Sequence, residues 1–232
     1  MNIAIIPARG GSRRIPGKNI KDFLGKPIIA YSINAALQSG IFDQVIVSTD
    51  SEEIANVAKE FGASVPFLRP TKLGENQVNV SDVLHYTLSE LLKTNPSIEF
   101  CCCIVATAPF IASNKLVEGY KIIQSQSADT VMSVTRFPFP IQRAFELDQE
   151  GFLTLVQPKH EFSHSNTLPE SFHDAAQFYF LNTKSFMETH SILGQKVYPI
   201  ILPNHQVRDI DTMEDWLMAE IMYQTCKERG LL

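Results

Sequence analysis

The residues best suited to chemistry lie in a loop at positions 7–19, directly after an apolar run at positions 3–6. The loop reads PARGGSRRIPGKN and holds adjacent glycines, Gly10 and Gly11, together with four cations. Glycine lets backbone N–H groups approach a ligand closely, and cations balance phosphate charge. The spacing matches neither G-x-G-x-x-G nor G-x-x-x-x-G-K-[ST], which disfavours hydride transfer and ATP hydrolysis. We expect this loop to grip a nucleoside triphosphate; the alternative is a basic surface loop.

A pair of carboxylates near the C-terminus, Asp209 and Asp211, is a second chemical feature. Residues two apart in an extended segment project to the same side, so the two side chains can share a hard divalent cation. Magnesium needs only one or two protein carboxylates, because it keeps water ligands and bridges substrate phosphates. We expect a Mg²⁺ site here. The alternative is that Asp211 and Thr212 simply begin a helix over residues 214–223.

The elements that must position these residues follow an α/β pattern. Short apolar runs alternate with helical stripes, as in parallel strands joined by crossover helices. Ligands of doubly wound sheets bind beyond the carboxyl ends of the strands, so distant segments can converge on one site. The candidate polar groups at these ends are Arg9, Asp50, Thr107, Arg136 and Arg208. The strands are expected at residues 3–7, 44–48, 64–67, 100–106, 130–135, 177–181 and 197–202.

The alternation fails between Phe137 and Phe172. Four prolines and a polar patch at 163–166 replace it, which is typical of a long excursion from a regular sheet. We expect a core formed by residues 1–136 and 173–232, with a small inserted subdomain at 137–172.

Composition narrows the class of protein. The chain has 232 residues and a formal net charge of −5, which disfavours wholesale nucleic-acid binding. No apolar stretch approaches membrane-spanning length, and the run at 3–6 is too short for a signal peptide. We expect a compact cytoplasmic protein that binds neither nucleic acid nor membrane.

Cysteine and tryptophan are expected in the core. Three of the four cysteines are consecutive, at 101–103 in a predicted strand, and we interpret them as small core residues in a reducing compartment rather than metal ligands or disulfide partners. The single tryptophan, Trp216, is expected to anchor the last helix together with Met213, Leu217 and Ile221.

The loop at 7–19 closely resembles the fingerprint of the CMP-sugar synthetases, which transfer CMP from CTP to acidic sugars such as sialic, pseudaminic and deoxy-octulosonic acid. The resemblance continues through residues 25–33, 45–50, 69–70, 106–110 and 208–212. It implies a Rossmann-like, mostly parallel fold of the nucleotide-diphospho-sugar transferase type. It also implies Mg²⁺ as cofactor and a homodimer, with the insertion at 137–172 covering the sugar site and joining the two copies.

The resemblance also implies roles for individual residues. Arg9, Lys18 and Asp211 would be catalytic, with Asp209 and Asp211 as the metal ligands. The segment Val78 to Ser81 departs from the threonine- or serine-rich pattern of the family, which leaves the cytosine contacts open. The residues expected to bind the nucleotide are Ala8, Arg9, Gly10, Gly11, Ser12, Lys18, Asn19, Arg69, Asn79, Ser81 and Thr107.

Two segments, 137–144 and 172–179, most resemble the members of this family that act on pseudaminic acid. Sialic-acid enzymes typically carry an asparagine-glycine pair where this chain has Ala175 and Ala176, which argues against sialic acid. An arginine can hold a carboxylate with two hydrogen bonds. A simpler reading is that His173 and Asp174 merely satisfy each other. The residues expected at the sugar are Gln142, Arg143, His173, Asp174 and Gln177.

The expected reaction is attack of the sugar's anomeric hydroxyl on the α-phosphorus of CTP, with pyrophosphate leaving in line. Three readings remain open. The sugar is pseudaminic acid; or it is another acidic keto-sugar, such as sialic, legionaminic or deoxy-octulosonic acid; or the chain binds a nucleotide without catalysis.

Overall fold

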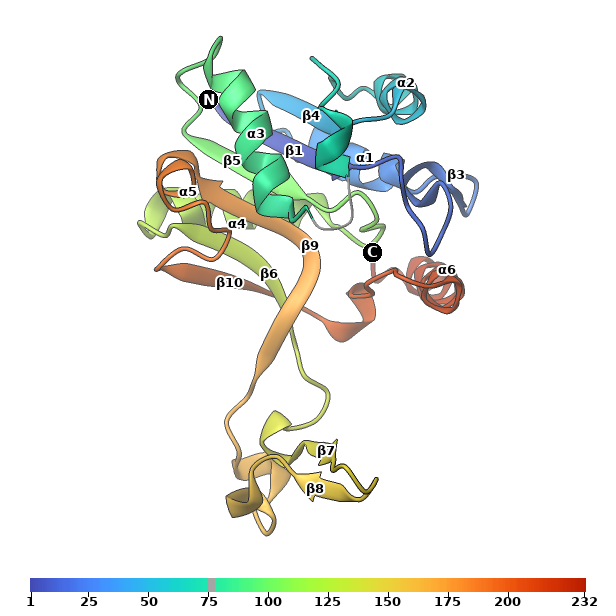
Figure 1. Ribbon diagram of the computed structural model, residues 1–232, viewed down its shortest axis with the longest axis vertical. Coiled ribbons are helices and arrows are strands. Elements are labelled where there is room, and N and C mark those ends of the chain that lie inside the picture. The colour runs from blue at the N-terminus through green and yellow to red at the C-terminus, as the bar shows by residue number, and fades with distance from the viewer. Residues whose placement is uncertain (75–77) are drawn as a thin grey trace.

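The computed structural model describes residues 1–74 and 78–232, which form a twisted sheet with helices on both faces and a slender projection on one side (Figure 1). The strands are β1 (Asn2–Ala8), β2 (Asp22–Phe23), β3 (Lys26–Pro27), β4 (Gln44–Thr49), β5 (Phe100–Ile104), β6 (Thr130–Arg136), β7 (Phe145–Leu147), β8 (Leu153–Leu155), β9 (Phe172–Asn182) and β10 (Val197–Leu202). The α-helices are α1 (Ile29–Ser39), α2 (Glu52–Glu60), α3 (Val80–Leu92), α4 (Ser113–Ser125), α5 (Thr183–Thr189) and α6 (Met213–Glu228).

The central sheet is mostly parallel, as the sequence predicts. Within the described residues its strand order is β10-β6-β9-β5-β1-β4. Strand β1 pairs in parallel with β4 and β5, and β6 pairs in parallel with β10, whereas β9 runs antiparallel to both of its neighbours. The prediction of a strand at 64–67 is wrong, because this segment forms only an isolated bridge between Ser64 and Ile46. The proline at position 66 lacks the N–H group that a longer ladder would need.

The core divides between the two faces of the sheet. Alternate residues of β1 point to opposite faces, so Ala4 and Ile6 pack with α1, α2 and α4, whereas Ile3 and Ile5 pack with α3 and α5. The three consecutive cysteines follow the same alternation and are fully buried. All four cysteines are free, and burial raises the pKa of the Cys101 thiol to about 12. Their interpretation as core residues is therefore confirmed.

A third cluster attaches helix α6 to the segment that follows the N-terminal loop. Trp216 is 3% exposed and its ring meets Phe23 edge-on at 5.5 Å. The prediction that Met213, Leu217 and Ile221 anchor the helix together with Trp216 is wrong, because these three side chains are about half exposed. Trp216 points toward the core, and these three side chains lie on the outer face of the same helix.

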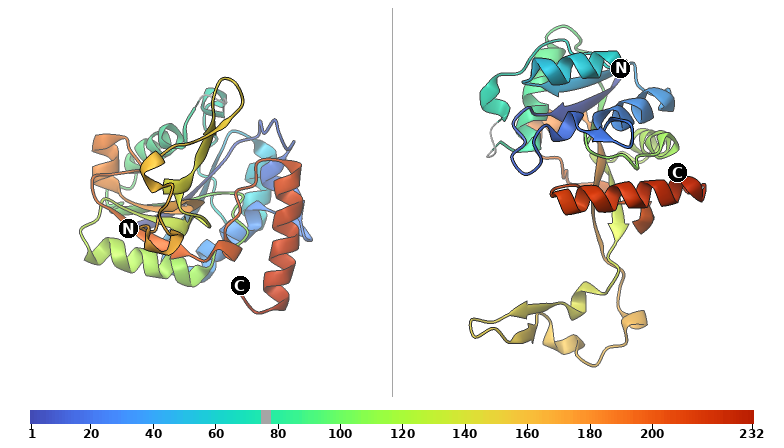
Figure 2. Two further views of the ribbon diagram at one scale, coloured as in Figure 1. Left: turned by 90° about the horizontal axis from the view of Figure 1, so that it is seen from below. Right: turned by 90° about the vertical axis from the view of Figure 1, so that its right-hand side faces the viewer.

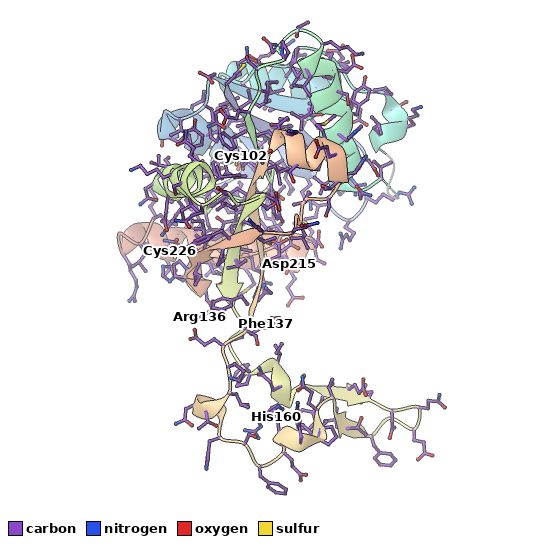
Figure 3. All side chains as sticks on the ribbon, turned by 90° about the vertical axis from the view of Figure 1, so that its left-hand side faces the viewer. Cys102, Arg136, Phe137, His160, Asp215 and Cys226 are labelled. Atoms are coloured by element: carbon purple, nitrogen blue, oxygen red, sulfur yellow. The ribbon has the colours of Figure 1, made fainter. Side chains whose placement is uncertain are left out.

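Residues 137–171, which we name the arm, extend away from the sheet (Figures 2 and 3). At its base the Phe137 N–H donates to the Ser171 carbonyl at 3.0 Å, and Arg136 pairs with Glu170 at 3.2 Å. The arm carries the two-stranded sheet of β7 and β8. Its large apolar side chains are widely exposed, Phe139 at 79% and Phe162 at 88%. Strand β9 begins at Phe172, one residue before the expected return to the core.

No α-helix in the described parts of the chain is both long and apolar enough to cross a membrane.

Candidate nucleotide-binding site

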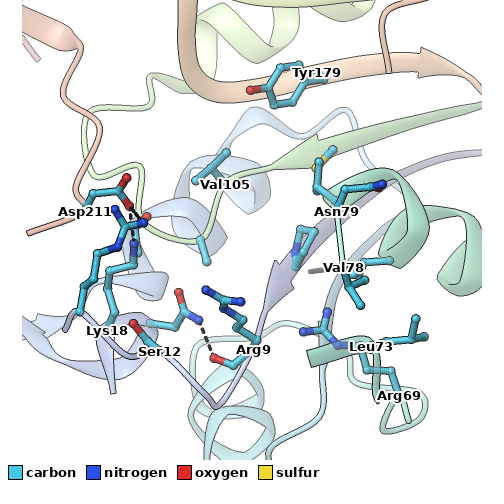
Figure 4. A pocket seen from close by; sticks show the side chains of 18 residues that line it. Arg9, Ser12, Lys18, Arg69, Leu73, Val78, Asn79, Val105, Tyr179 and Asp211 are labelled. Atoms are coloured by element: carbon cyan, nitrogen blue, oxygen red, sulfur yellow. Dashed lines mark hydrogen bonds and ion pairs between the residues drawn. The ribbon is translucent and has the colours of Figure 1, made fainter. Parts of the chain in front are cut away.

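A cleft of about 410 Å³ opens beyond the carboxyl ends of β1 and β5, where the fold class predicts a ligand (Figure 4). Among the described residues, the charged side chains that line it are four cations and one carboxylate: Arg9, Arg14, Lys18, Arg69 and Asp211. The N-terminal loop forms one side, the start of α3 another, and Tyr179 of β9 lies across from the loop. The excess of positive charge suits a polyphosphate.

The N-terminal loop is held in place by hydrogen bonds from several segments. The Gly10 N–H donates to Asp50 Oδ1 at 2.9 Å, and the Ser12 N–H donates to the Gly10 carbonyl at 3.1 Å. The side-chain amide of Asn19, which is buried, donates to the Arg9 carbonyl at 2.9 Å. The loop therefore has a definite shape that presents Arg9 and Ser12 to the cleft.

Lys18 and Asp211 meet at the mouth of the cleft, although 192 residues separate them in the chain. Lys18 Nζ donates to the Ile210 carbonyl at 2.7 Å and lies 3.4 Å from Asp211 Oδ1. Arg14 Nη2 approaches the same carboxylate oxygen at 2.9 Å. Asp211 thus sits between two cations that a triphosphate would also attract.

Asp211 does not cap helix α6. That position belongs to Thr212, whose hydroxyl accepts from the Asp215 N–H at 3.2 Å while Asp215 accepts from the Thr212 N–H at 2.9 Å, a capping box. The alternative drawn from the sequence, that Asp211 and Thr212 simply begin the helix, therefore applies to Thr212 alone. The carboxylate of Asp211 is left to face the cleft.

Asp209 and Asp211 lie close enough for their charges to interact. The pKa of Asp209 is raised, mainly because its carboxylate is partly desolvated and secondly because Asp211 is negatively charged. No group of three or more His, Cys, Asp and Glu residues suited to a metal ion occurs among the described residues. Two carboxylates on one segment, of which Asp211 lines the cation-rich cleft, have the chemistry that suits Mg²⁺, an ion that takes its remaining ligands from water and phosphate.

Arg69 lines the cleft, as expected of a nucleotide contact, and it is only 4% exposed, which is unusual for a cation. One guanidinium nitrogen donates to the Ser48 carbonyl at 3.1 Å, and another lies 3.6 Å from Asp50 Oδ1. Burial lowers the pKa of Arg69, which the charge of Asp50 opposes. Its Nε is buried without a hydrogen-bond partner in the described part of the chain.

The other expected nucleotide contacts are placed unequally. Thr107 and Asn79 line the cleft, and the Asn79 side chain also caps α3 by accepting from the Asp82 N–H at 2.9 Å. Gly10 and Gly11 stay exposed, but the Gly10 N–H is engaged by Asp50. The Ala8 side chain is buried in the core, and Ser81 lies in the first turn of α3, outside the cleft lining among the described residues.

The expected sugar residues divide into two groups. Asp174 accepts a hydrogen bond from the Tyr179 hydroxyl at 2.6 Å, and the buried Gln177 donates to the Gln206 carbonyl. His173 and Asp174 do not satisfy each other through their side chains, since His173 Nδ1 instead meets the Asp174 backbone carbonyl at 2.9 Å.

Gln142 and Arg143 lie in the arm, outside the described lining of the cleft. Gln142 is buried there and donates to the Pro169 carbonyl at 3.1 Å, whereas Arg143 is exposed. The single chain therefore does not bring Arg143 to the nucleotide residues.

Arg14 and Tyr179 line the cleft with strongly hydrogen-bonding side chains, yet the sequence analysis assigned neither of them a role. Arg14 lay within the recognised basic loop without an assigned role, and its spacing offered no way to choose it over Arg13. Tyr179 lay inside an apolar strand run and carried no separate signal. Burial and its hydrogen bond to Asp174 raise the pKa of Tyr179, so its hydroxyl stays a donor.

Comparison with known proteins identifies the class. A family model described as cytidylyltransferase matches residues 3–215, and the chain belongs to this family.

The chain is also similar to individual proteins of this family. The chain is 43% identical to the pseudaminic acid cytidylyltransferase of Campylobacter jejuni over 228 residues, covering 98% of each chain. It is 32% identical to the CMP-N,N'-diacetyllegionaminic acid synthase of Legionella pneumophila, covering 97% of each. A solved structure of CMP:2-keto-3-deoxy-manno-octonic acid synthetase complexed with CTP aligns with a TM-score of 0.68 at 14% identity, over 98% of this chain and 99% of the other, and supports the fold.

Proposed function

We propose that this protein transfers CMP from CTP to the anomeric hydroxyl of pseudaminic acid, giving CMP-pseudaminic acid and pyrophosphate. The proposal rests mainly on the cation-lined cleft beyond the carboxyl ends of β1 and β5, in a chain that belongs to the cytidylyltransferase family. The substrates follow from the full-length similarity to the Campylobacter jejuni pseudaminic acid cytidylyltransferase.

In this reaction the sugar oxygen forms a bond to the α-phosphorus, while the bond from that phosphorus to the bridging oxygen breaks. Pyrophosphate leaves with the bonding electrons, and the hydroxyl proton passes to solvent. Arg9 and Lys18 reach the cleft from one loop and would neutralise the charge that grows on the leaving phosphates. The protein's main contribution is position and charge, so no separate protein base is required.

Asp209 and Asp211 would hold Mg²⁺ at the phosphates. Their oxygens suit this ion, and they lie on the segment that brings Asp211 to the cleft. When bound, the ion would polarise the α-phosphate and lower the pKa of the attacking hydroxyl. Arg14 and Lys18, which now pair with Asp211, would turn to the triphosphate.

The nucleotide would lie with its phosphates against the N-terminal loop and its cytidine toward Arg69, Asn79 and Thr107. The Nε–H group of the buried Arg69 has no hydrogen-bond partner among the described residues, so it could donate to an oxygen of the base or the ribose. Asn79 lines the cleft at the start of α3, where its side-chain oxygen caps the helix.

The acidic sugar would bind beside Asp174 and Tyr179, above the phosphates. Because Arg143 lies on the arm and the arm exposes large aromatic side chains, we propose a homodimer in which the arm of one copy covers the cleft of the other. Arg143 of the partner subunit would then bind the sugar carboxylate. A cytoplasmic location fits the four free, buried cysteines.

The experiment is pyrophosphate release from CTP and Mg²⁺ with pseudaminic, legionaminic, sialic and deoxy-octulosonic acids tested in parallel. Release with pseudaminic acid at the highest kcat/KM supports the proposal. Release with another acid alone keeps the reaction and overturns the sugar. CTP binding without release with any acid favours a non-catalytic nucleotide-binding protein.

A further inference from the structure

Asp50 lies just behind the cleft, where three segments of the nucleotide site meet. It follows β4, and its side chain is 13% exposed. One carboxylate oxygen, Oδ1, accepts the Gly10 N–H at 2.9 Å and lies 3.6 Å from Arg69 Nη2. A carboxylate can accept several donors at once, so one group can tie a backbone amide to a guanidinium.

The third segment touches Asp50 from the side of residues 71–74. A Cβ atom added to Gly74 would overlap the Asp50 carboxylate, so this backbone packs directly against the acid. The same short helical turn supplies Leu73 to the cleft lining. Asp50 therefore contacts the N-terminal loop, Arg69 and the turn at 71–74, each of which reaches the cleft.

Arg69 depends on such a partner because it is a buried cation. Its main-chain N–H donates to the Thr49 carbonyl and its side chain folds back to the Ser48 carbonyl, which fixes its stem beside β4. Carbonyl groups do not neutralise a charge. Among the described residues, Asp50 is the carboxylate paired with Arg69, and Arg9 opposes it as a like charge. Without Asp50, the guanidinium would lose the charge that holds it inward.

We infer that Asp50 is a positioning residue for the nucleotide: it holds Arg69 and the Gly10 backbone in a fixed relation, so that the base end and the phosphate end of the site are set together. The inference rests on the proposed binding of CTP. Asp50 is not among the described residues that line the cleft, so it would act on the nucleotide through Arg69 and Gly10.

The test compares two isosteric substitutions at opposite ends of one strand. Asp50→Asn keeps an oxygen for the Gly10 N–H but removes the charge opposite Arg69. Asp43→Asn is the matched control, since Asp43 accepts the backbone N–H of Asn2 at 2.7 Å at the far end of β1. KM values for CTP and for the sugar, kcat, the melting temperature and direct CTP binding are measured for both variants and the wild type.

We expect Asp50→Asn to raise KM for CTP by about tenfold or more, which corresponds to one charged hydrogen-bonding partner lost, and to leave KM for the sugar within about twofold. Asp50→Glu, which restores the charge one methylene further out, should recover part of the CTP affinity. Asp43→Asn should leave KM for CTP unchanged whatever it does to stability.

Other outcomes separate the inference from the proposed function. If the wild type binds CTP normally and Asp50→Asn has the same KM for CTP, the positioning role alone is overturned. An equal rise of KM for CTP in Asp50→Asn and Asp43→Asn overturns it as well. A wild type that neither binds nor turns over CTP overturns the proposed function first. Where Asp50→Asn does not fold, Asp50→Glu is judged by the same criterion, an altered or unaltered KM for CTP.

Discussion

Asp211→Ala separates catalysis from stability at one residue. The Asp211 side chain is 37% exposed, and its ion pairs are with Arg14, 63% exposed, and Lys18. Pairs of this kind contribute about 0–1 kcal/mol each, so the loss of both should lower the melting temperature by no more than about 8 °C. Lys18 keeps its hydrogen bond to the Ile210 carbonyl after the substitution. No core cavity forms, and the fold should survive.

Turnover should fall much further. Loss of a metal ligand removes charge stabilisation worth several kcal/mol from the transition state, and about 3–4 kcal/mol corresponds to a 100- to 1,000-fold decrease in kcat. The assay is pyrophosphate release from CTP and pseudaminic acid across a Mg²⁺ titration, with thermal denaturation alongside. Glu214→Ala is the control, an exposed acid three residues further on that lies in the first turn of α6.

The result that would refute the metal assignment is a folded Asp211→Ala protein with kcat within about threefold of the wild type and the same Mg²⁺ dependence. A large fall in melting temperature would refute a different step of the reasoning, namely that the Asp211 carboxylate does not stabilise helix α6. A matching loss of turnover in Glu214→Ala would show that local negative charge, rather than ligation, matters.

Three further outcomes test other parts of the molecule. Arg143→Ala should raise KM for the acidic sugar by about tenfold or more while KM for CTP stays unchanged, as two-substrate kinetics will show. Phe162→Asp, at the most exposed aromatic of the arm, should shift the protein from dimer to monomer in sedimentation or light scattering. Asp215→Asn should lower the melting temperature at pH 7, because the Thr212 hydrogen bonds lower the pKa of Asp215. A depressed carboxyl pKa stabilises the fold above its ordinary value of about 3.9, so the difference from wild type should close as pH falls below that value.

The sheet could be predicted because its strands carry strong local signals. The cysteines at 101–103 and the run at 3–6 are buried on both faces, so apolar residues are continuous there. The direction of β9 could not be predicted, because an antiparallel strand inside a parallel sheet reads the same as its neighbours. The prediction that Leu217 and Ile221 pack with Trp216 failed for a related reason. Both are apolar at helical spacing, yet nothing in the local sequence distinguishes a core face of α6 from an exposed one.

The site was predictable where chemistry is concentrated in one loop and less so where contacts span the chain. Arg9 and Lys18 stand out by type and spacing. The burial of Arg69 depends on Ser48 and Asp50, which lie about twenty residues earlier, so the residues next to Arg69 in the sequence do not indicate it. The position of Arg143 depends on the arm's reach, which no pattern of residues encodes locally.

The ion pairs at the cleft mouth would couple the proposed binding of metal and nucleotide. Arg14 and Lys18 both pair with Asp211, and both cations would have to leave this carboxylate to bind the triphosphate. Phosphate bound to these cations would free the carboxylate for Mg²⁺, and Mg²⁺ on the carboxylate would free the cations for phosphate. Thermodynamic linkage makes this effect equal in both directions.

Asp211→Asn should therefore change CTP binding in opposite ways with and without metal. Without Mg²⁺, the variant should bind CTP up to about fivefold more tightly, because an exposed ion pair of up to about 1 kcal/mol no longer competes for Arg14 and Lys18. With Mg²⁺, the extra affinity that the wild type gains should be lost. Calorimetric titration with CTP in EDTA and in Mg²⁺ measures both terms. Weaker binding in EDTA than the wild type shows would contradict the competition, because Asp211 would then assist the nucleotide directly.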